Sequence, residues 1–290
     1  MLGCAAMITR LDRIVLATPR RRVAVEAWQR LFDAKLVRED RVACLAAIRS
    51  VLRVGESEVE LLEPDGIGIT AQHVSRSRTS IFAVGLAVTD LAAAQANLDA
   101  RAIHHVREGQ QLWMSGEWTG IAALRVALTQ DERRPGAGVL QRIYEVTHLH
   151  GSHRREAQRF AKLFQLDPKQ QAPIRSEPFG YEGTLAFVQP DQLDRVEFVT
   201  PSDRTKTMGR FFARQGPSFY MFYAESRDTA ALRERLLEHA PKQWTGPRDG
   251  AAPDNLFVHP QALHGALLGV SRESVAWTWS GHPERVRPAA

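Results

Sequence analysis

An arginine and a glutamate occur twice in this sequence at corresponding places in a repeated pattern. Arg13 and Glu60 form the first pair, and Arg142 and Glu197 form the second. A guanidinium group stays charged at any working pH and can bind a carboxylate through two hydrogen bonds. Each pair is therefore either a structural salt bridge or part of a site. In a site, the arginine would neutralise an anionic ligand and the glutamate would transfer a proton.

The repeat is recognised from its ends. One copy opens at residues 11–18 with LDRIVLAT and closes at 59–64 with VELLEP; the other opens at 140–147 with LQRIYEVT and closes at 196–201 with VEFVTP. Alignment on the two arginines gives the second copy about eight extra residues, three of them before its helix. We expect each arginine to lie within hydrogen-bond reach of the glutamate in its own copy.

Histidines offer a second kind of chemistry. His148, His150 and His153 are near enough in sequence for a small metal or proton-transfer cluster, although no compatible fourth ligand is nearby. His259 and His264 flank the last turn, where they either hydrogen-bond the hairpin or contribute to a site.

Aromatic side chains could line a ligand pocket in the second half. Tyr220 and Phe222 lie on one expected strand, and Trp244 follows in a later segment. Packing in the core is the alternative for these three residues. Tyr144 shares a strand face with Arg142 by the two-residue period, so it is the preferred phenol for a cavity.

Four modules with the order βαβββ position these side chains. Apolar periodicity predicts helices over 23–36, 91–100, 155–166 and 229–240, and modules starting near residues 11, 80, 140 and 218. Residues 55–57 read as a hairpin turn and 131–138 as a domain linker. Residues 64–79 read as a connection, and 201–216 contain a short basic segment. We therefore expect an α+β protein with two curved mixed-sheet domains, at 7–132 and 139–275, and a C-terminal tail at 276–290.

Composition limits the class of protein. Apolar residues make up 44% and charged residues 24%, as in globular domains, and no apolar run is long enough to cross a membrane. The net charge of +5 is spread along the chain, and Arg20 to Arg22 is the only dense basic cluster, so nucleic-acid binding is not expected. Cys4 and Cys44 have no ligand spacing, and the lipoprotein-like start at residues 1–6 lacks an export segment before it. A cytoplasmic protein is predicted.

Four such modules resemble the vicinal oxygen chelate superfamily, which includes glyoxalase I, methylmalonyl-CoA epimerase, bleomycin-resistance proteins and type I extradiol dioxygenases. The resemblance covers essentially the whole chain and is sharpest at residues 11–17, 58–64 and 257–270. The last stretch looks like the final hairpin of glyoxalase-like domains. The resemblance implies that this chain has the superfamily's fold. It also implies a ligand site in the C-terminal half, where extradiol dioxygenases have theirs.

The resemblance also locates the family's metal. His or Gln from first strands and Glu from fourth strands commonly hold it; the corresponding residues here are Arg13, Glu60, Ala83 and Leu124 in the first half and Arg142, Glu197, Tyr220 and Gly269 in the second. Arginine has no lone pair for a metal, so its charge would instead substitute for the cation. No metal is expected, with Fe, Mn or Zn as the alternative.

These observations predict a protein that binds a small aromatic or anionic molecule in its C-terminal half. Glu197, Tyr144 and His264 are the candidate catalytic residues, and the candidate substrate-binding residues are Arg142, Tyr220, Phe222, Trp244 and His259. A metal-independent lyase, isomerase or hydrolase is favoured. The alternatives are a non-catalytic binding or resistance protein, and a metal-dependent dioxygenase or lyase with ligands from residues 148–153. A homodimer is one possible assembly.

Overall fold

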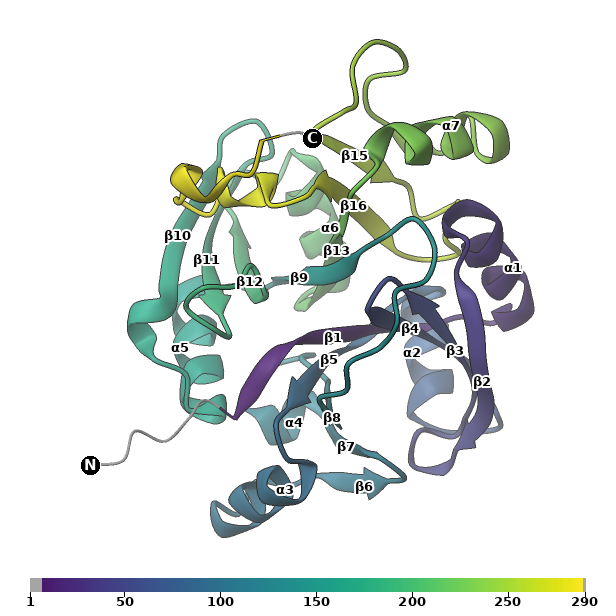
Figure 1. Cartoon of the computed structure of the whole chain (residues 1–290). Helices are drawn as coiled ribbons and strands as arrows, with labels where there is room; N and C mark the ends of the chain where they lie inside the picture. The colour runs from purple at the N-terminus through teal and green to yellow at the C-terminus, as the bar shows by residue number, and fades with distance from the viewer. Residues whose placement is uncertain (1–6, 289–290) are drawn as a thin grey trace. The chain divides into compact units, whose positions relative to one another are not determined.

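The computed structural model describes residues 7–288 (Figure 1), which form two eight-stranded mixed sheets and seven α-helices. The predicted α+β class is confirmed. Cys4 and the lipoprotein-like start lie outside the described residues. Within residues 7–288 no helix is both long and apolar enough to cross a membrane.

The first sheet has the strand order β2-β3-β4-β1-β5-β8-β7-β6. Its elements, in chain order, are β1 (Ile8–Ala17), α1 (Arg21–Phe32), β2 (Lys35–Val42), β3 (Ala47–Val54), β4 (Ser57–Pro64), α2 (Ile69–Ser77), β5 (Ser80–Val88), α3 (Leu91–Ala100), β6 (Val106–Glu108), β7 (Gln111–Met114), α4 (Gly116–Thr119) and β8 (Val126–Gln130).

The second sheet repeats this order as β10-β11-β12-β9-β13-β16-β15-β14. Its elements are β9 (Arg142–Leu149), α5 (His153–Phe164), β10 (Gln171–Ser176), β11 (Tyr181–Phe187), β12 (Arg195–Pro201), α6 (Thr207–Gln215), β13 (Ser218–Ser226), α7 (Thr229–His239), β14 (Trp244–Thr245), β15 (Asn255–Val258) and β16 (Leu267–Arg272). In each of the four modules the first strand runs parallel to the fourth and the other pairs are antiparallel, so the predicted βαβββ modules are confirmed.

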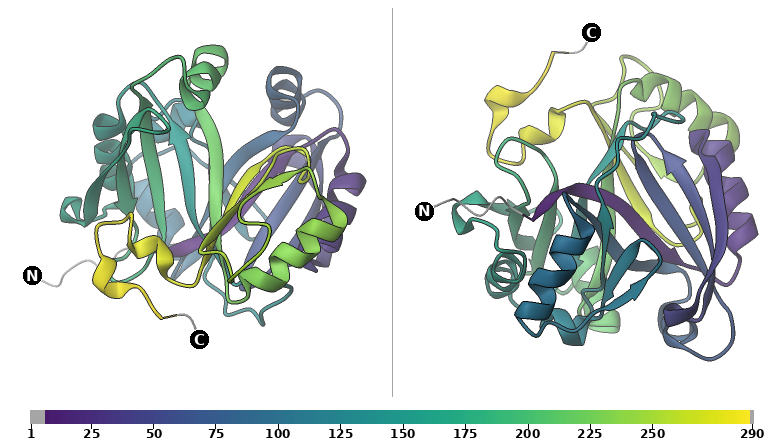
Figure 2. Two further views of the ribbon diagram at one scale, coloured as in Figure 1. Left: turned by 90° about the horizontal axis from the view of Figure 1, so that it is seen from above. Right: turned by 60° about the horizontal axis from the view of Figure 1, so that its bottom comes forward.

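Amphipathic helices cover one face of the strands. In α1 the apolar side chains that recur at helical spacing, Val25, Trp28, Leu31 and Phe32, are buried. In α5 the ring of Phe160 lies 5.6 Å from that of Phe198 on β12, and Figure 2 shows α5 along β11 and β12. The side chains on the opposite face of these strands are therefore directed away from the helices.

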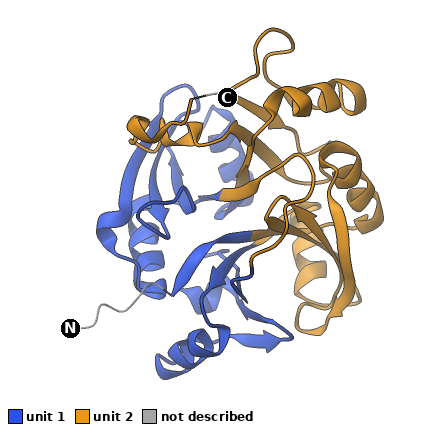
Figure 3. Ribbon diagram, in the orientation of Figure 1, with its two compact units in different colours: residues 1–12, 84–132, 145–219 blue, residues 13–83, 133–144, 220–290 orange. Residues whose placement is uncertain are grey.

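By spatial proximity the chain divides into two compact units (Figure 3). Unit 1 comprises residues 7–12, 84–132 and 145–219 among those described, and unit 2 comprises 13–83, 133–144 and 220–288. The sequence-based boundaries at 132 and 139 stay predictions.

Two segments in which no helix was expected contain one. Residues 64–79 include α2, in which Thr70 is the only buried side chain. The sequence of α2 therefore has no apolar stripe from which a helix could be predicted. Residues 201–216 include α6, where Met208 is buried. The helix expected at 23–36 begins two residues earlier, at Arg21. It ends at Phe32, because Asp33 adopts a left-handed conformation that terminates the helix.

The predicted hairpin turn at 55–57 is present and packs against a distant segment of unit 2. Gly55 (φ +60°) donates its N–H to the Ala137 carbonyl oxygen at 2.5 Å, and Glu56 donates to the Gln141 carbonyl oxygen at 2.8 Å. A Cβ atom on Gly55 would lie 1.9 Å from that Gln141 oxygen. The turn therefore requires glycine for its backbone angle and for close approach.

We predict that Gly55→Ala lowers the free energy of unfolding by about 2–4 kcal/mol, from both backbone strain and overlap with Gln141. Gly66→Ala is the control, because Gly66 also has a positive φ, +88°, but open space around its Cα. It should cost only about 1 kcal/mol. Urea unfolding measures both; equal losses would refute the close packing of the turn.

Candidate functional site

Six alternating charges connect four strands of the first sheet, β1, β4, β3 and β2, with the segment before β9 in unit 2. Arg13 Nη1 lies 2.6 Å from Glu60 Oε1 and 2.8 Å from Glu58 Oε2. Arg49 donates to the second oxygen of Glu60 at 3.0 Å and binds Asp40 through two nitrogens. Arg134, 3.4 Å from Glu58, completes the series. The predicted Arg13–Glu60 pair is confirmed, and the Glu60 pKa is lowered because both arginines outweigh its burial.

The second sheet carries a different cluster at the corresponding place in unit 1. Arg195 is fully buried and donates from Nε to Glu145 Oε2 at 2.7 Å. Its guanidinium lies 5.5 Å from the centre of the Phe187 ring. Glu197, 3% exposed, accepts a 2.6 Å hydrogen bond from the Thr147 hydroxyl.

Strand register aligns the two clusters. Glu58 is opposite Arg13 in the first sheet, and Arg195 is opposite Glu145 in the second. Arg13 also precedes the first residue of α1 by eight positions, as Glu145 precedes the first residue of α5. Glu145 is thus the equivalent of Arg13, and the two charges of the pair are exchanged between the sheets.

The expected pair between Arg142 and Glu197 is therefore wrong. Thr147, not Arg142, is opposite Glu197, and Arg142 lies five residues earlier on β9, roughly 16 Å along a strand. The alignment on two similar Arg-Ile dipeptides was displaced by three residues. The extra residues of the second copy follow its helix, and none precedes it.

Glu197 is the most perturbed carboxyl of the second cluster. Burial, and then the negative charge of Glu145, raises its pKa to about 8, against the smaller effects of Thr147, Arg195 and Tyr181. Because Arg195 is bound to Glu145, its positive charge stabilises the ionised form of Glu197 only in part. A carboxyl that is largely protonated at neutral pH and ionises near pH 8 can both donate and accept a proton.

Arg142 and Tyr144 lie in unit 2. Arg142 Nε is 3.3 Å from a carboxylate oxygen of Glu225, and the Tyr144 hydroxyl is 3.1 Å from that of Ser271. Tyr144 is fully buried, with its ring 6.0 Å from that of Tyr223. Both predicted residues belong to one face of β9, with partners on β13 and β16.

The Tyr223 ring fills the space that a side chain at position 269 would enter, and the family's last metal ligand is expected at that position. Gly269 is directly opposite Tyr223, and a Cβ atom on Gly269 would lie 2.1 Å from ring atom Cε1 of Tyr223. Glu60 and Glu197 occupy the corresponding fourth-strand positions of modules one and three. A glycine covered by a phenol ring, with arginines beside the remaining carboxylates, does not fit the family's metal.

The other predicted binding residues are placed separately in unit 2. Phe222 is fully buried with its ring 6.3 Å from Trp28, and Trp244 is also buried, beside Arg248. Tyr220 is partly exposed on β13. His259 is within 2.7 Å of the Thr245 hydroxyl, which supports the hairpin reading, and His264 lines a pocket considered below.

The histidine segment lies on the α5 face of the second sheet in unit 1. His148 is fully buried, and its ring is 6.2 Å from that of His150. Neither ring nitrogen has a hydrogen bond of ordinary geometry, although an interaction with the Ala123 backbone opposes the lowering of the His148 pKa. His150 Nδ1 is 3.5 Å from the buried carboxylate of Glu156. Within residues 7–288, however, no three His, Cys, Asp or Glu side chains are arranged to hold a metal ion.

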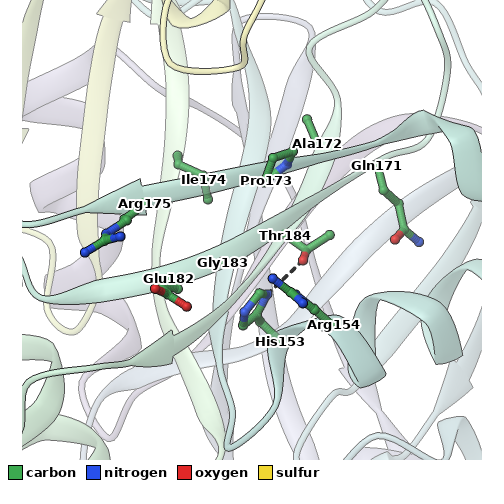
Figure 4. Close-up of a pocket in the computed structure, with 10 residues that line it drawn as sticks. All are labelled: His153, Arg154, Gln171, Ala172, Pro173, Ile174, Arg175, Glu182, Gly183 and Thr184. Carbon is green, nitrogen blue, oxygen red and sulfur yellow. Dashed lines mark hydrogen bonds between the residues drawn. The ribbon is translucent and has the colours of Figure 1, made fainter.

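A pocket of about 590 Å³ opens between the first turn of α5 and the β10–β11 hairpin (Figure 4). His153 contacts the Thr184 hydroxyl at 2.8 Å, and Arg154, Arg175 and Glu182 supply charge at its edge. Thr184 pairs with Phe198 rather than Glu197, so the pocket is on the face opposite Glu197. Among the residues that line this pocket, only His153 was a candidate from the sequence. Arg154 and Arg175 have no sequence feature that distinguishes them from other surface arginines.

Comparisons with known proteins support the fold. No family model and no curated protein matches the sequence. A triple mutant of 4-hydroxymandelate synthase from Streptomyces coelicolor is similar at 13% identity, with a TM-score of 0.68 over 91% of this chain and 92% of that chain. A fusion of a xylose isomerase-like TIM barrel with 4-hydroxyphenylpyruvate dioxygenase gives 0.61 at 12% identity, over 97% of this chain and 53% of that chain.

These similarities define the class. The chain has the vicinal oxygen chelate fold, as the sequence predicted. The similarity to 4-hydroxymandelate synthase extends over nearly the whole of both chains, and so over all four modules of this one. Methylmalonyl-CoA epimerase from Mycobacterium tuberculosis, which matches 46% of this chain and 93% of its own at 20% identity, gives a TM-score of only 0.39.

The equivalent residues Glu60 and Glu197 should respond oppositely to substitution. Glu60→Gln leaves two buried arginines without their shared carboxylate, so it should cost about 3 kcal/mol of unfolding free energy. The raised Glu197 pKa means that stability is lost as pH rises from 4.5 to about 8. Glu197→Gln should therefore stabilise by about 2–4 kcal/mol at pH 8 and by less than about 1 kcal/mol at pH 5. Urea unfolding at both pH values measures this; destabilisation by both variants would mean that Glu197 is a stably paired carboxylate.

His148 should control acid stability. Burial and then His150 lower its pKa to about 3, so stability falls as pH decreases from 6.5 to 3 while only the unfolded chain takes up the proton. His148→Leu should move the acid-unfolding midpoint lower and add roughly 3 kcal/mol at pH 4. His104→Leu, at an exposed histidine, is the control. An unchanged midpoint for His148→Leu would show that the ring finds a proton acceptor.

Proposed function

We propose that this protein binds a small aromatic or anionic organic molecule in its C-terminal half and transfers a proton to or from it without the family's metal. The observation that carries this proposal is Glu197, a buried carboxyl with its pKa raised to about 8 at a family ligand position. Keeping such a carboxyl costs stability at neutral pH, and costs of this kind concentrate at functional sites.

The residues around Glu197 support a proton-transfer role. Thr147 donates its hydroxyl hydrogen to Glu197 Oε2 and so fixes the orientation of the carboxyl group. Arg195, held by Glu145, supplies positive charge to the same cluster and would favour a substrate that gains negative charge. Removal of a C–H proton beside a carbonyl or carboxylate creates such a charge. A lyase or isomerase step fits these groups better than hydrolysis does.

The ligand class rests on residue chemistry together with the neighbours' names. The structures that share this layout are named for 4-hydroxymandelate and 4-hydroxyphenylpyruvate, both aromatic acids. Within unit 1, the Glu197 cluster itself supplies a guanidinium, Arg195, and the Phe187 ring beside it. We propose an aromatic hydroxy or oxo acid as ligand. A homodimer and a cytoplasmic location stay predictions from the sequence.

Deuterium exchange tests the proposal. The full chain is incubated with 4-hydroxymandelate or 4-hydroxyphenylpyruvate in D₂O with EDTA, and loss of the acidic C–H signal is followed by proton NMR. Binding is measured by calorimetry. We expect metal-independent exchange whose rate rises between pH 7 and about 8, as Glu197 ionises. In Glu197→Gln the rate should fall at least about a hundredfold.

A matched control and three other results separate the readings. Thr147→Val keeps the shape but removes the hydrogen bond, so it should shift the pH midpoint upward without abolishing exchange. Binding without exchange in any variant would favour the non-catalytic binding protein. Exchange only after addition of Fe, Mn or Zn would favour relocated metal ligands at residues 148–153. Absence of binding by both acids would reject this ligand class.

A further inference from the structure

A second pocket, of about 400 Å³, lies in unit 2 and is formed by three segments distant in sequence. The corner after β1 contributes Thr18, Pro19 and Arg20; the junction between α2 and β5 contributes Val74, Arg78 and Thr79; and the loop before β16 contributes His264. The lining contains two arginines, one histidine and two hydroxyl groups, and no acidic side chain.

The two arginines have charges that no carboxylate neutralises. Neither Arg20 nor Arg78 forms an ion pair with any described residue, and both are exposed. Other arginines of unit 2, such as Arg13 and Arg49, are held by acidic partners. The pocket therefore concentrates uncompensated positive charge within a cavity, an arrangement that favours an anion.

Backbone strain coincides with the pocket. Arg78 has φ 57° and ψ −108°, and His264 has φ 50°, conformations that residues with a Cβ adopt at a cost. Gly265 (φ +130°) brings its loop so near that a Cβ atom would lie 2.1 Å from Thr79 Cγ2. The loop is thereby fixed against Thr79, with His264 at the pocket.

We propose that this pocket binds a phosphate group, either as free phosphate or as the phosphomonoester of a small metabolite. Two guanidinium groups match the geometry of phosphate oxygens. The Thr18 hydroxyl accepts from the Arg20 N–H and from the Thr79 hydroxyl, which leaves its own hydrogen to donate, and the His264 ring is a further donor. This site involves no residue of the Glu197 cluster. It is independent of the function proposed above.

His264 supplies a signature of occupancy. Burial, then the charges of Arg20 and Arg30, lowers its pKa, and Arg78 is the second arginine of the pocket lining. A bound phosphate would offset these charges and favour the imidazolium. Binding should therefore raise the His264 pKa.

Calorimetric titration of the full chain with inorganic phosphate and with glycerol 3-phosphate, at constant ionic strength, tests the proposal. Arg20→Gln should weaken affinity at least about tenfold. Arg22→Gln is the matched control, since Arg22 belongs to the same basic corner but does not line the pocket. Arg78→Gly should weaken binding equally while raising the melting temperature, because glycine relieves the positive φ. That gain excludes misfolding as the cause of lost binding.

Two ligands distinguish the sources of the phosphate group. Tighter binding of glycerol 3-phosphate identifies a phosphomonoester site, and equal binding identifies a site for the phosphate group alone. NMR titration of His264 should show its pKa rising with either ligand. The proposal is overturned if neither ligand binds at about 10 mM, if Arg22→Gln weakens binding as much as Arg20→Gln, or if the His264 titration is unchanged.

Discussion

A buried carboxylate on the fourth strand of a module must find a positive charge or take up a proton, and this requirement explains the two halves of the molecule. At Glu60 the requirement is met by Arg13 and Arg49, each within 3.0 Å of one oxygen. At Glu197 the nearest arginine, Arg195, is engaged by Glu145. The same side chain at the same register is therefore ionised in one sheet and largely protonated at neutral pH in the other.

An additional arginine in the first sheet produces this difference. Each sheet has one central guanidinium and two carboxyls, but Arg49 holds the second oxygen of Glu60, whereas Gly183 occupies the corresponding position in the second sheet. With Arg13 on the first strand, two acidic residues, Glu58 and Glu60, can share one guanidinium. With Glu145 on the first strand, the second sheet places two carboxyls around Arg195. One positive charge for two buried carboxyls leaves one carboxyl undercompensated.

The sequence predicted the modules because their periodicity is strong and their turns use glycine. The turn at Gly55 and the module starts near 80 and 218 agree with the strands observed. Helix α2 was missed since its residues bury almost nothing, and packing that depends on distant segments gives no local signal. The Arg13–Glu60 contact followed from the two-residue period of strands.

The second site could be predicted only in part. Glu197 was found from the repeat, whereas Glu145 and Arg195 were missed because alignment relied on residue identity rather than distance to the helix start. Counting eight residues back from α5 would have identified Glu145. The phosphate pocket could not be found from sequence, because three separated segments bring Arg20, Arg78 and His264 together. The sequence shows only that these three residues are basic.

The protonation state of Glu197 is the central claim, and carbon NMR tests it directly. The full chain, labelled with ¹³C at the glutamate side-chain carboxyl, is titrated between about pH 4 and pH 9, and the Glu197 signal is assigned by its loss in Glu197→Gln. The account predicts a midpoint near pH 8 for this carboxyl. A midpoint below about pH 5, in the ordinary range of glutamate, would contradict it.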